Sequence, residues 1–172
     1  MFSDPIKNLD QFNVDPSMHV ADMGAGSGFY TIEAAKRVGS SGRVYAIEVQ
    51  KDLLPKLKAN AAHAHLFNVE VLWGDIEKLG GTRLRDACVD RVIVSNILFQ
   101  VEHKEDFSKE VRRIIKQNGK ILVVDWSEVS PLGPKTLVPE VVAKALFEKA
   151  GFIFERTIRA GDHHYGMVFK CK

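Results

Sequence analysis

The feature that most constrains the fold of this chain is a repeated alternation between short apolar runs and segments with helical periodicity. The apolar runs predict strands at 18–22, 42–49, 69–75, 90–96 and 120–126. The helical patterns predict helices at 29–39, 51–64 and 104–119. Strands that are apolar on both faces need helices on both sides, and parallel neighbours need a crossover connection. The alternation therefore predicts a doubly wound α/β fold around a parallel sheet.

The end of the chain departs from this alternation. A predicted helix at 139–151 leads into a strand at 152–158, and only the short segment "RAGDHHYG" separates that strand from the β-rich "MVFKCK" at 167–172. A connection of this length suits a hairpin, so the last strand is predicted to run antiparallel. The segment "SPLGPK" at 130–135 is expected to form a loop over the edge of the sheet.

Length and composition set further bounds. With 172 residues the chain fits one domain, 1–172, in which residues 1–17 form an N-terminal lead or lid. The net charge of +2 is too small to predict nucleic-acid binding, and no apolar run reaches the roughly 18 residues of a membrane span. The cytoplasm is the expected location. Cys88 and Cys171 lack the spacing of a zinc site, and no metal site is expected.

The stretch "VADMGAGSGFYT" at 20–31 places three glycines, Gly24, Gly26 and Gly28, between the first predicted strand and the first predicted helix. In an open α/β sheet such a turn forms the floor of the ligand crevice, because glycine lets the backbone approach a ligand and the following helix offers free N–H groups. Dinucleotide enzymes use G-x-G-x-x-G, which would require glycine where this chain has Phe29. The turn predicts a ligand site that differs from the dinucleotide pattern.

Three carboxylates accompany this turn. Asp22, Glu48 and Asp75 end the first, second and third predicted strands, and the carboxyl ends of parallel strands meet at one edge of the sheet. Glu48 could accept hydrogen bonds from both hydroxyls of a ribose, whereas the acidic crevice would repel phosphates. A ligand with a ribose, an amine and a positive charge but no phosphate fits best. S-adenosylmethionine has all three.

The segments "VADMGAGSGFYT", "VYAIEV", "VLWGDIEKL", "DRVIVSNILFQV" and "GKILVVDW" resemble, in this order and spacing, the motifs of class I S-adenosylmethionine-dependent methyltransferases. The likeness is greatest to the quinone-biosynthesis-like (type 11) group and covers roughly residues 18–170. It implies a Rossmann-like three-layer sandwich with a seven-stranded, mostly parallel sheet whose last strand is antiparallel. That antiparallel strand agrees with the hairpin inferred from the spacing.

The resemblance also implies roles for individual residues. Asp22 and the backbone of residues 24–28 would hold the methionine portion of the cofactor, Glu48 the ribose, and Asp75 with the Ile76 amide the adenine edge. Ser95 and Asn96 would close the site beside the sulfonium. The predicted cofactor residues are Asp22, Gly24, Ala25, Gly26, Gly28, Glu48, Val49, Gly74, Asp75, Ile76, Ser95 and Asn96.

The acceptor side carries weaker signals. The segment that caps the substrate in this group is almost absent, so the site is expected to be shallow, or closed by a partner subunit or by residues 1–12. Phe2 and Phe12 could close it, although simple packing is the more usual role of a terminal apolar residue. The loop 160–166 should emerge beside the end of the fifth strand. His163, His164 and Tyr165, with Trp126, are therefore candidates for orienting or deprotonating an acceptor, although a solvated hairpin tip is the alternative.

Methyl transfer from an activated sulfonium requires little beyond in-line positioning of the acceptor and exclusion of water. The expected function is transfer to a small-molecule acceptor by a monomer or homodimer. A protein side chain or an RNA as acceptor remains an alternative, as does a non-catalytic nucleotide-binding regulatory module. The near-neutral charge of the chain argues against RNA.

Overall fold

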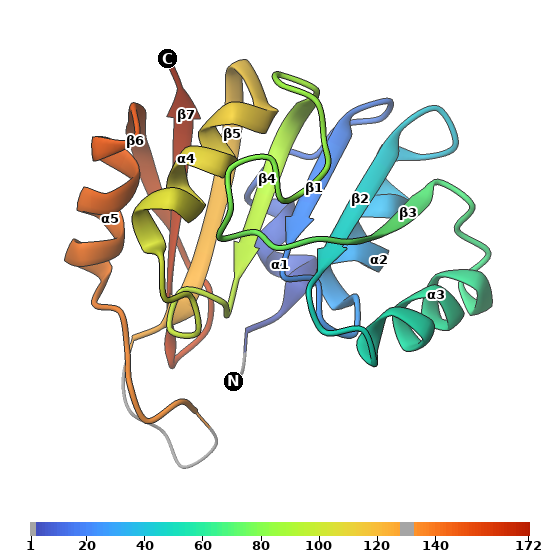
Figure 1. The fold of residues 1–172 in the computed structure, drawn as a ribbon, viewed down its shortest axis with the longest axis horizontal. Helices are drawn as coiled ribbons and strands as arrows, with labels where there is room; N and C mark the ends of the chain where they lie inside the picture. The colour runs from blue at the N-terminus through green and yellow to red at the C-terminus, as the bar shows by residue number, and fades with distance from the viewer. Residues whose placement is uncertain (1–2, 128–132) are drawn as a thin grey trace.

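In the computed structural model, residues 3–127 and 133–172 are described, and they form a seven-stranded sheet with the order β3-β2-β1-β4-β5-β7-β6 (Figure 1). The strands are β1 His19–Met23, β2 Arg43–Glu48, β3 Val69–Trp73, β4 Val89–Ser95, β5 Ile115–Trp126, β6 Phe152–Ile158 and β7 His164–Cys171. Strands β1 to β5 pair in parallel, and β7 pairs antiparallel with both β5 and β6. The fold class expected from the sequence is confirmed.

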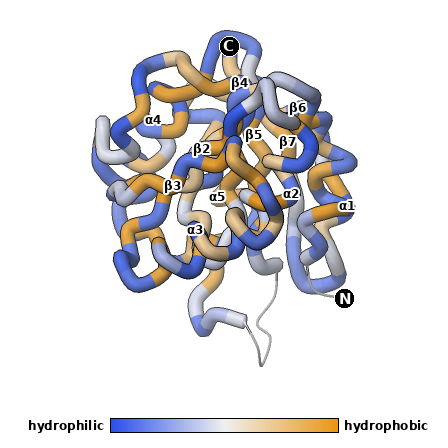
Figure 2. The backbone as a smooth tube through the Cα atoms, turned by 90° about the vertical axis from the view of Figure 1, so that its right-hand side faces the viewer, coloured by the Kyte–Doolittle hydropathy of each residue, from blue (hydrophilic) through white to orange (hydrophobic). Residues whose placement is uncertain are grey.

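Five helices pack around this sheet within the described residues. They are α1 Pro5–Asp10, α2 Phe29–Val38, α3 Leu53–His63, α4 Lys104–Ile114 and α5 Glu140–Lys149. One buried cluster joins a sheet face to α4 and α5 through Phe107, Val111 and Phe147, and a second joins the opposite face to α1 and α2 through Leu9 and Ala34. The hydrophobic stretches of the chain accordingly follow the strands, with hydrophilic loops outside them (Figure 2).

The long helix predicted at 104–119 is wrong at its end. Helix α4 ends at Ile114, and β5 begins at the next residue. Ile115 already pairs with Val89, and the register shifts before Arg91 meets Lys120. The extra residues include Asn118, whose φ of 62° is left-handed. The Asn-Gly pair thus forms an irregularity inside a strand, where the sequence predicted the end of a helix.

The N-terminal lead contains a helix that the sequence analysis did not predict. Asp4 caps α1 by accepting a hydrogen bond from the Ile6 N–H at 3.0 Å. Leu9 and Phe12 are fully buried in the core, so Phe12 packs under the sheet and does not close a site. Phe2 lies outside the described residues. The helix was missed because one and a half turns carry too little periodicity to detect.

The C-terminal hairpin forms as predicted, although β7 starts three residues earlier than expected, at His164. Its first residues pair with the end of β5, with His164 opposite Trp126 and Tyr165 opposite Asp125. The loop expected at 130–135 falls partly on residues 128–132, which lie outside the described residues. Among the helices described, none has the length and apolar character that crossing a membrane requires.

Candidate functional site

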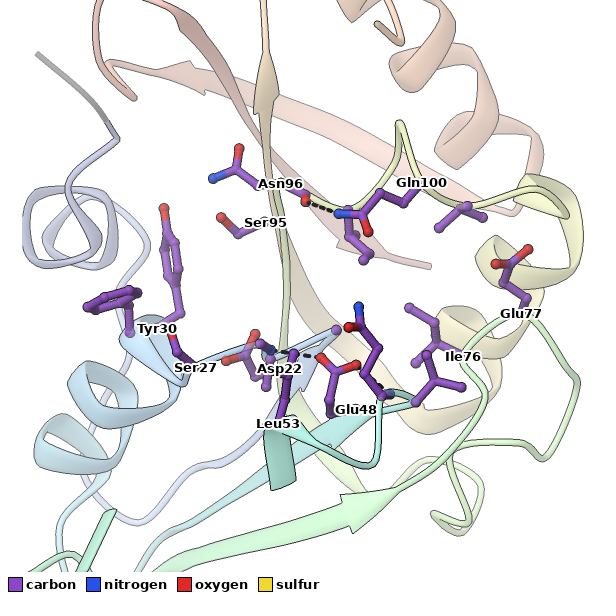
Figure 3. Close-up of a pocket in the computed structure, with 18 of the residues that line it drawn as sticks. Asp22, Ser27, Tyr30, Glu48, Leu53, Ile76, Glu77, Ser95, Asn96 and Gln100 are labelled. Carbon is purple, nitrogen blue, oxygen red and sulfur yellow. Dashed lines mark hydrogen bonds between the residues drawn. The ribbon is translucent and has the colours of Figure 1, made fainter. Parts of the chain in front are cut away.

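A pocket of about 670 Å³ opens at the carboxyl ends of β1, β2 and β4 (Figure 3). The sheet order reverses between β1 and β4, and a crevice at this point is the usual ligand site of an open α/β sheet. The predicted residues that line the pocket are Asp22, Gly24, Ala25, Gly26, Glu48, Val49, Asp75, Ile76, Ser95 and Asn96. The pocket therefore lies where the motifs placed the cofactor.

The glycine turn divides into positions that face the pocket and one that packs behind it. Gly24, Gly26 and Gly28 all have positive φ, at 74°, 55° and 89°. A Cβ on Gly26 would meet no atom within 4 Å, whereas a Cβ on Gly28 would lie 2.2 Å from a side-chain carbon of Leu57. Gly28 does not line the pocket and instead lets α3 pack closely. The predicted Gly74 is also outside the lining, and a Cβ there would lie 2.6 Å from the carbonyl oxygen of Gly81.

Glu48 binds the glycine turn directly. Its Oε2 accepts a hydrogen bond from the Gly26 N–H at 2.9 Å, and its Oε1 accepts one from the Gln50 N–H at 2.8 Å. The side chain is only 5% exposed. A carboxylate has about four lone-pair sites, so each oxygen can still accept a hydroxyl from a ligand. Glu48 is thus fixed by two backbone amides at the position expected for a ribose partner.

Asp22 lies deeper in the pocket. It is 3% exposed, and its Oδ2 accepts a hydrogen bond from the Thr31 hydroxyl at 2.6 Å. Burial raises the pKa of this carboxyl to about 6, against the lowering effect of the Thr31 hydrogen bonds. A positively charged ligand beside Asp22 would favour its ionised form.

The loop after β3 supplies the third predicted carboxylate and a fourth that the sequence analysis missed. Burial acts to raise the pKa of Asp75, but hydrogen bonds from Lys78 and the Glu77 N–H outweigh it and lower the pKa. Glu77 also lines the pocket, and its Oε2 accepts hydrogen bonds from the N–H groups of Glu102 and His103 at the start of α4. This contact joins residues 25 positions apart in the sequence, so no local sequence pattern indicates that Glu77 belongs to the site.

A second wall of the pocket carries no charge. Ser95 ends β4 and Asn96 follows it, and both were predicted. Tyr30, which was not predicted, lies on the same side of the pocket, and Ser3 also lines it. Asn8 donates a hydrogen bond to the Tyr30 hydroxyl at 2.6 Å, and that hydroxyl lies 3.1 Å from the Ser3 hydroxyl. Burial raises the pKa of Tyr30, so the hydroxyl stays protonated at neutral pH. Helix α1 therefore builds part of the site.

The charge of the lining restricts the ligand. Four carboxylates line the pocket, and no lysine, arginine or histidine appears among its described lining residues. A pyrophosphate would meet only like charge there, whereas a sulfonium with an ammonium group would be attracted. The open space beside Gly26 leaves room for a nucleoside, and Glu48, held by two backbone N–H groups, can accept its hydroxyls. The residues present therefore fit S-adenosylmethionine.

The four residues suggested for the acceptor lie near this edge of the sheet, outside the pocket lining. The rings of Trp126 and His164 stack with centroids 4.4 Å apart, and the Ser127 N–H donates to the His163 carbonyl oxygen at 2.9 Å. Tyr165 is buried in the core cluster, and burial lowers the pKa of His164. Their assignment as catalytic candidates stays a prediction. Within 3–127 and 133–172, no group of three or more potential metal-binding side chains occurs.

The chain is similar to known proteins over most of its length. A family described as "Methyltransferase domain" matches residues 14–156. The ubiquinone/menaquinone biosynthesis C-methyltransferase UbiE of Bordetella avium is 34% identical over 127 residues, which cover 73% of this chain and 48% of that protein. The arsenite methyltransferase of Halobacterium salinarum is 26% identical over 150 residues, which cover 80% and 38%. The chain thus spans about half or less of these curated relatives.

A crystal structure of a SAM-dependent methyltransferase from Aquifex aeolicus superposes with a TM-score of 0.91 at 29% identity, covering 99% of this chain and 91% of that chain. These matches confirm the resemblance that the motifs predicted, and the chain belongs to the methyltransferase domain family.

Proposed function

We propose a methyl-transfer function for this chain, because it belongs to the methyltransferase domain family. In this proposal it transfers the methyl group of S-adenosylmethionine to a small-molecule acceptor by in-line displacement. The observation that carries the proposal is the pocket itself, in which a glycine turn, a ribose-type carboxylate and an otherwise acidic lining lie together.

Each part of the lining has a role toward the cofactor. Glu48 would accept the ribose hydroxyls, Asp75 and the Ile76 amide would bind the adenine edge, and Asp22 with the glycine turn would hold the methionine portion. The negative charge of the lining would favour the cationic cofactor over its neutral thioether product, S-adenosylhomocysteine. The same charge therefore assists product release.

The cofactor supplies a methyl group already activated on a positively charged sulfur. The chain has then to bring an acceptor into line with that methyl group and to exclude water. No described lining residue is a histidine, so the proposal assigns no base of that kind. An acceptor with a good lone pair suits this arrangement.

A small molecule is favoured as acceptor because the pocket is enclosed on two sides, by α1 and by the loop after β4. The named activities of the two curated relatives, quinone biosynthesis and arsenite methylation, support this class. A protein side chain is the second candidate, since the exposed Phe29 leaves one rim of the pocket open. Action as a monomer or homodimer in the cytoplasm completes the proposal.

Calorimetric titration with S-adenosylmethionine, S-adenosylhomocysteine and NAD is the first test. Micromolar binding of both sulfur compounds, with no binding of NAD, is expected. The second step is transfer of tritiated methyl from the cofactor to a mixed metabolite extract, before and after protease or ribonuclease treatment. Label in small molecules supports the proposal. Label only in protein or RNA, or binding of the cofactor without any transfer, refutes the small-molecule assignment.

A further inference from the structure

We propose that Asn96 and Tyr30 position the methyl acceptor, and that the acceptor is a molecule without negative charge that presents an O–H or N–H group to the Asn96 carboxamide. This inference rests on the proposed function and names the substrate class of the same pocket. The sequence resemblance placed Asn96 beside the cofactor, whereas its surroundings in the structure assign it to the acceptor.

The carboxamide oxygen of Asn96 carries the argument. This Oδ1 atom is buried and accepts no hydrogen bond from any residue that the structure describes. A buried acceptor without a partner costs about 1–3 kcal/mol, which a ligand that donates to it would recover. Asn96 also lines the pocket, and in this proposal its carboxamide turns about its side-chain bonds to meet the donor group of an occupant.

The backbone holds Asn96 in a fixed position. Its N–H donates to the carbonyl oxygen of Val124 at 2.8 Å, and its own carbonyl oxygen accepts a long hydrogen bond from Gln100 at 3.4 Å. Its φ of 53° is in the left-handed region, which asparagine tolerates better than most residues. These contacts hold the backbone of Asn96 beside the pocket, so its side chain starts from a fixed point.

Tyr30 provides the second contact. Its hydroxyl accepts a hydrogen bond from Asn8, and Ser95 lies close enough to lower the pKa of that hydroxyl. Figure 3 shows Tyr30, Ser95 and Asn96 on one side of the pocket, with Glu48, Ile76 and Glu77 on the other. The uncharged wall is therefore separate from the side that suits the nucleoside.

The charge of the whole lining excludes a negatively charged acceptor. No cation among the described lining residues could neutralise a carboxylate or a phosphate, and four carboxylates would repel either group. The exposed ring of Phe29 and the ring of Pro5 offer apolar contact beside the polar groups. A compound with apolar surface, a hydroxyl or amine and no negative charge fits these surroundings.

The test uses phenol, anisole and benzoate as probes and measures their binding to the full chain saturated with S-adenosylhomocysteine, by ligand-observed NMR titration. Phenol donates a hydrogen bond, anisole has the same ring without the donor, and benzoate carries a charge. One hydrogen bond contributes about 1 kcal/mol, so phenol should bind about fivefold more tightly than anisole. Benzoate should bind most weakly.

Asn96→Gly removes the carboxamide and keeps a backbone that accepts positive φ, so the variant should fold. It should weaken the binding of phenol about fivefold and leave the binding of anisole unchanged. Tyr30→Phe should also weaken the binding of phenol selectively. Asn118→Gly is the matched control, because Asn118 is exposed with a φ of 62° and lies outside the pocket lining. The control should change the binding of neither phenol nor anisole.

Equal binding of phenol and anisole to the unmodified chain would overturn the inference, as would equal weakening of both by Asn96→Gly. Preferential binding of benzoate would overturn the exclusion of negatively charged acceptors. Failure of the chain to bind S-adenosylhomocysteine is a different result, since it would remove the proposed function on which the inference rests.

Discussion

The two walls of the pocket are built in different ways. The acidic wall consists of side chains at consecutive strand ends, with Glu48 bound to the N–H of Gly26, 22 positions away in the glycine turn. The uncharged wall requires α1 to reach across the fold, where Asn8 and Ser3 contact Tyr30. The acidic wall follows from the topology of the sheet, whereas the uncharged wall follows from how one short helix packs on it. Cofactor binding and acceptor choice can therefore be separated by mutation.

The largest expected effect is on the acidic wall. Glu48→Ala should weaken the binding of S-adenosylmethionine at least about 100-fold. Two charged hydrogen bonds to the ribose, of about 1.5–3 kcal/mol each, are lost in this variant. Calorimetry measures the change. Glu70→Ala is the control, since Glu70 forms only an exposed ion pair with Arg43. Affinity retained within about threefold in Glu48→Ala would contradict the ribose assignment.

The next effect separates two glycines of the turn. Gly28→Ala should lower the free energy of unfolding by about 3 kcal/mol, because left-handed backbone strain adds to an overpacked contact with Leu57. Gly26→Ala, with open space at its Cβ, should cost only about 1–2 kcal/mol but obstruct the cofactor. Urea unfolding and calorimetry measure the two quantities. Equal losses of stability in both variants would contradict this division.

A smaller effect concerns pH. The folded pKa of Asp22, about 6, lies above its usual value of 3.8, so its stabilising contribution is complete below about pH 4 and is lost as the pH rises through 6. Burial also raises the pKa of Asp125 to about 6, so its ionisation lowers the stability over the same pH range. Stability of the free chain should therefore fall between pH 4 and 6, and Asp22→Asn should flatten part of the decrease. Urea unfolding at several pH values measures it.

The same ionisation should affect the two sulfur compounds differently. Affinity for the cationic S-adenosylmethionine should rise about fivefold as the pH increases through 6, because ionised Asp22 attracts it. Affinity for S-adenosylhomocysteine should change less, and Asp22→Asn should abolish the difference. Parallel pH profiles for both compounds in the unmodified chain would show that Asp22 does not face the sulfonium.

The smallest effect tests the uncharged wall. Asn8→Ala removes the hydrogen bonds to Tyr30 and Ser3 and should cost about 1–2 kcal/mol of stability. It should weaken phenol binding about threefold, because one hydrogen bond that orients Tyr30 is lost, while binding of S-adenosylhomocysteine stays within about twofold. If both ligands lose affinity together, the two walls are not independent.

The acidic wall was predictable because each of its parts follows from a local pattern. Apolar runs locate the strands, and residues that end parallel strands share one edge, so Asp22, Glu48 and Asp75 could be brought together without coordinates. Glu77 could not, because its contact with the start of α4 links segments that no periodicity relates. Tyr30 was missed because the aromatic residue of a helix that faces a pocket has the same spacing as one that faces a core.

The sequence by itself determined the parallel sheet, the antiparallel last strand and the position of the ligand crevice, because these depend on periodicity and on glycine positions. Only the tertiary structure decided that α1 forms a wall of the pocket, and that His164, Tyr165 and Trp126 lie outside its lining. It also decided that Gly28 packs against Leu57 while Gly26 faces the pocket. The physical reason is that side-chain contacts between distant segments depend on packing distances of a few ångströms, which residue spacing does not encode.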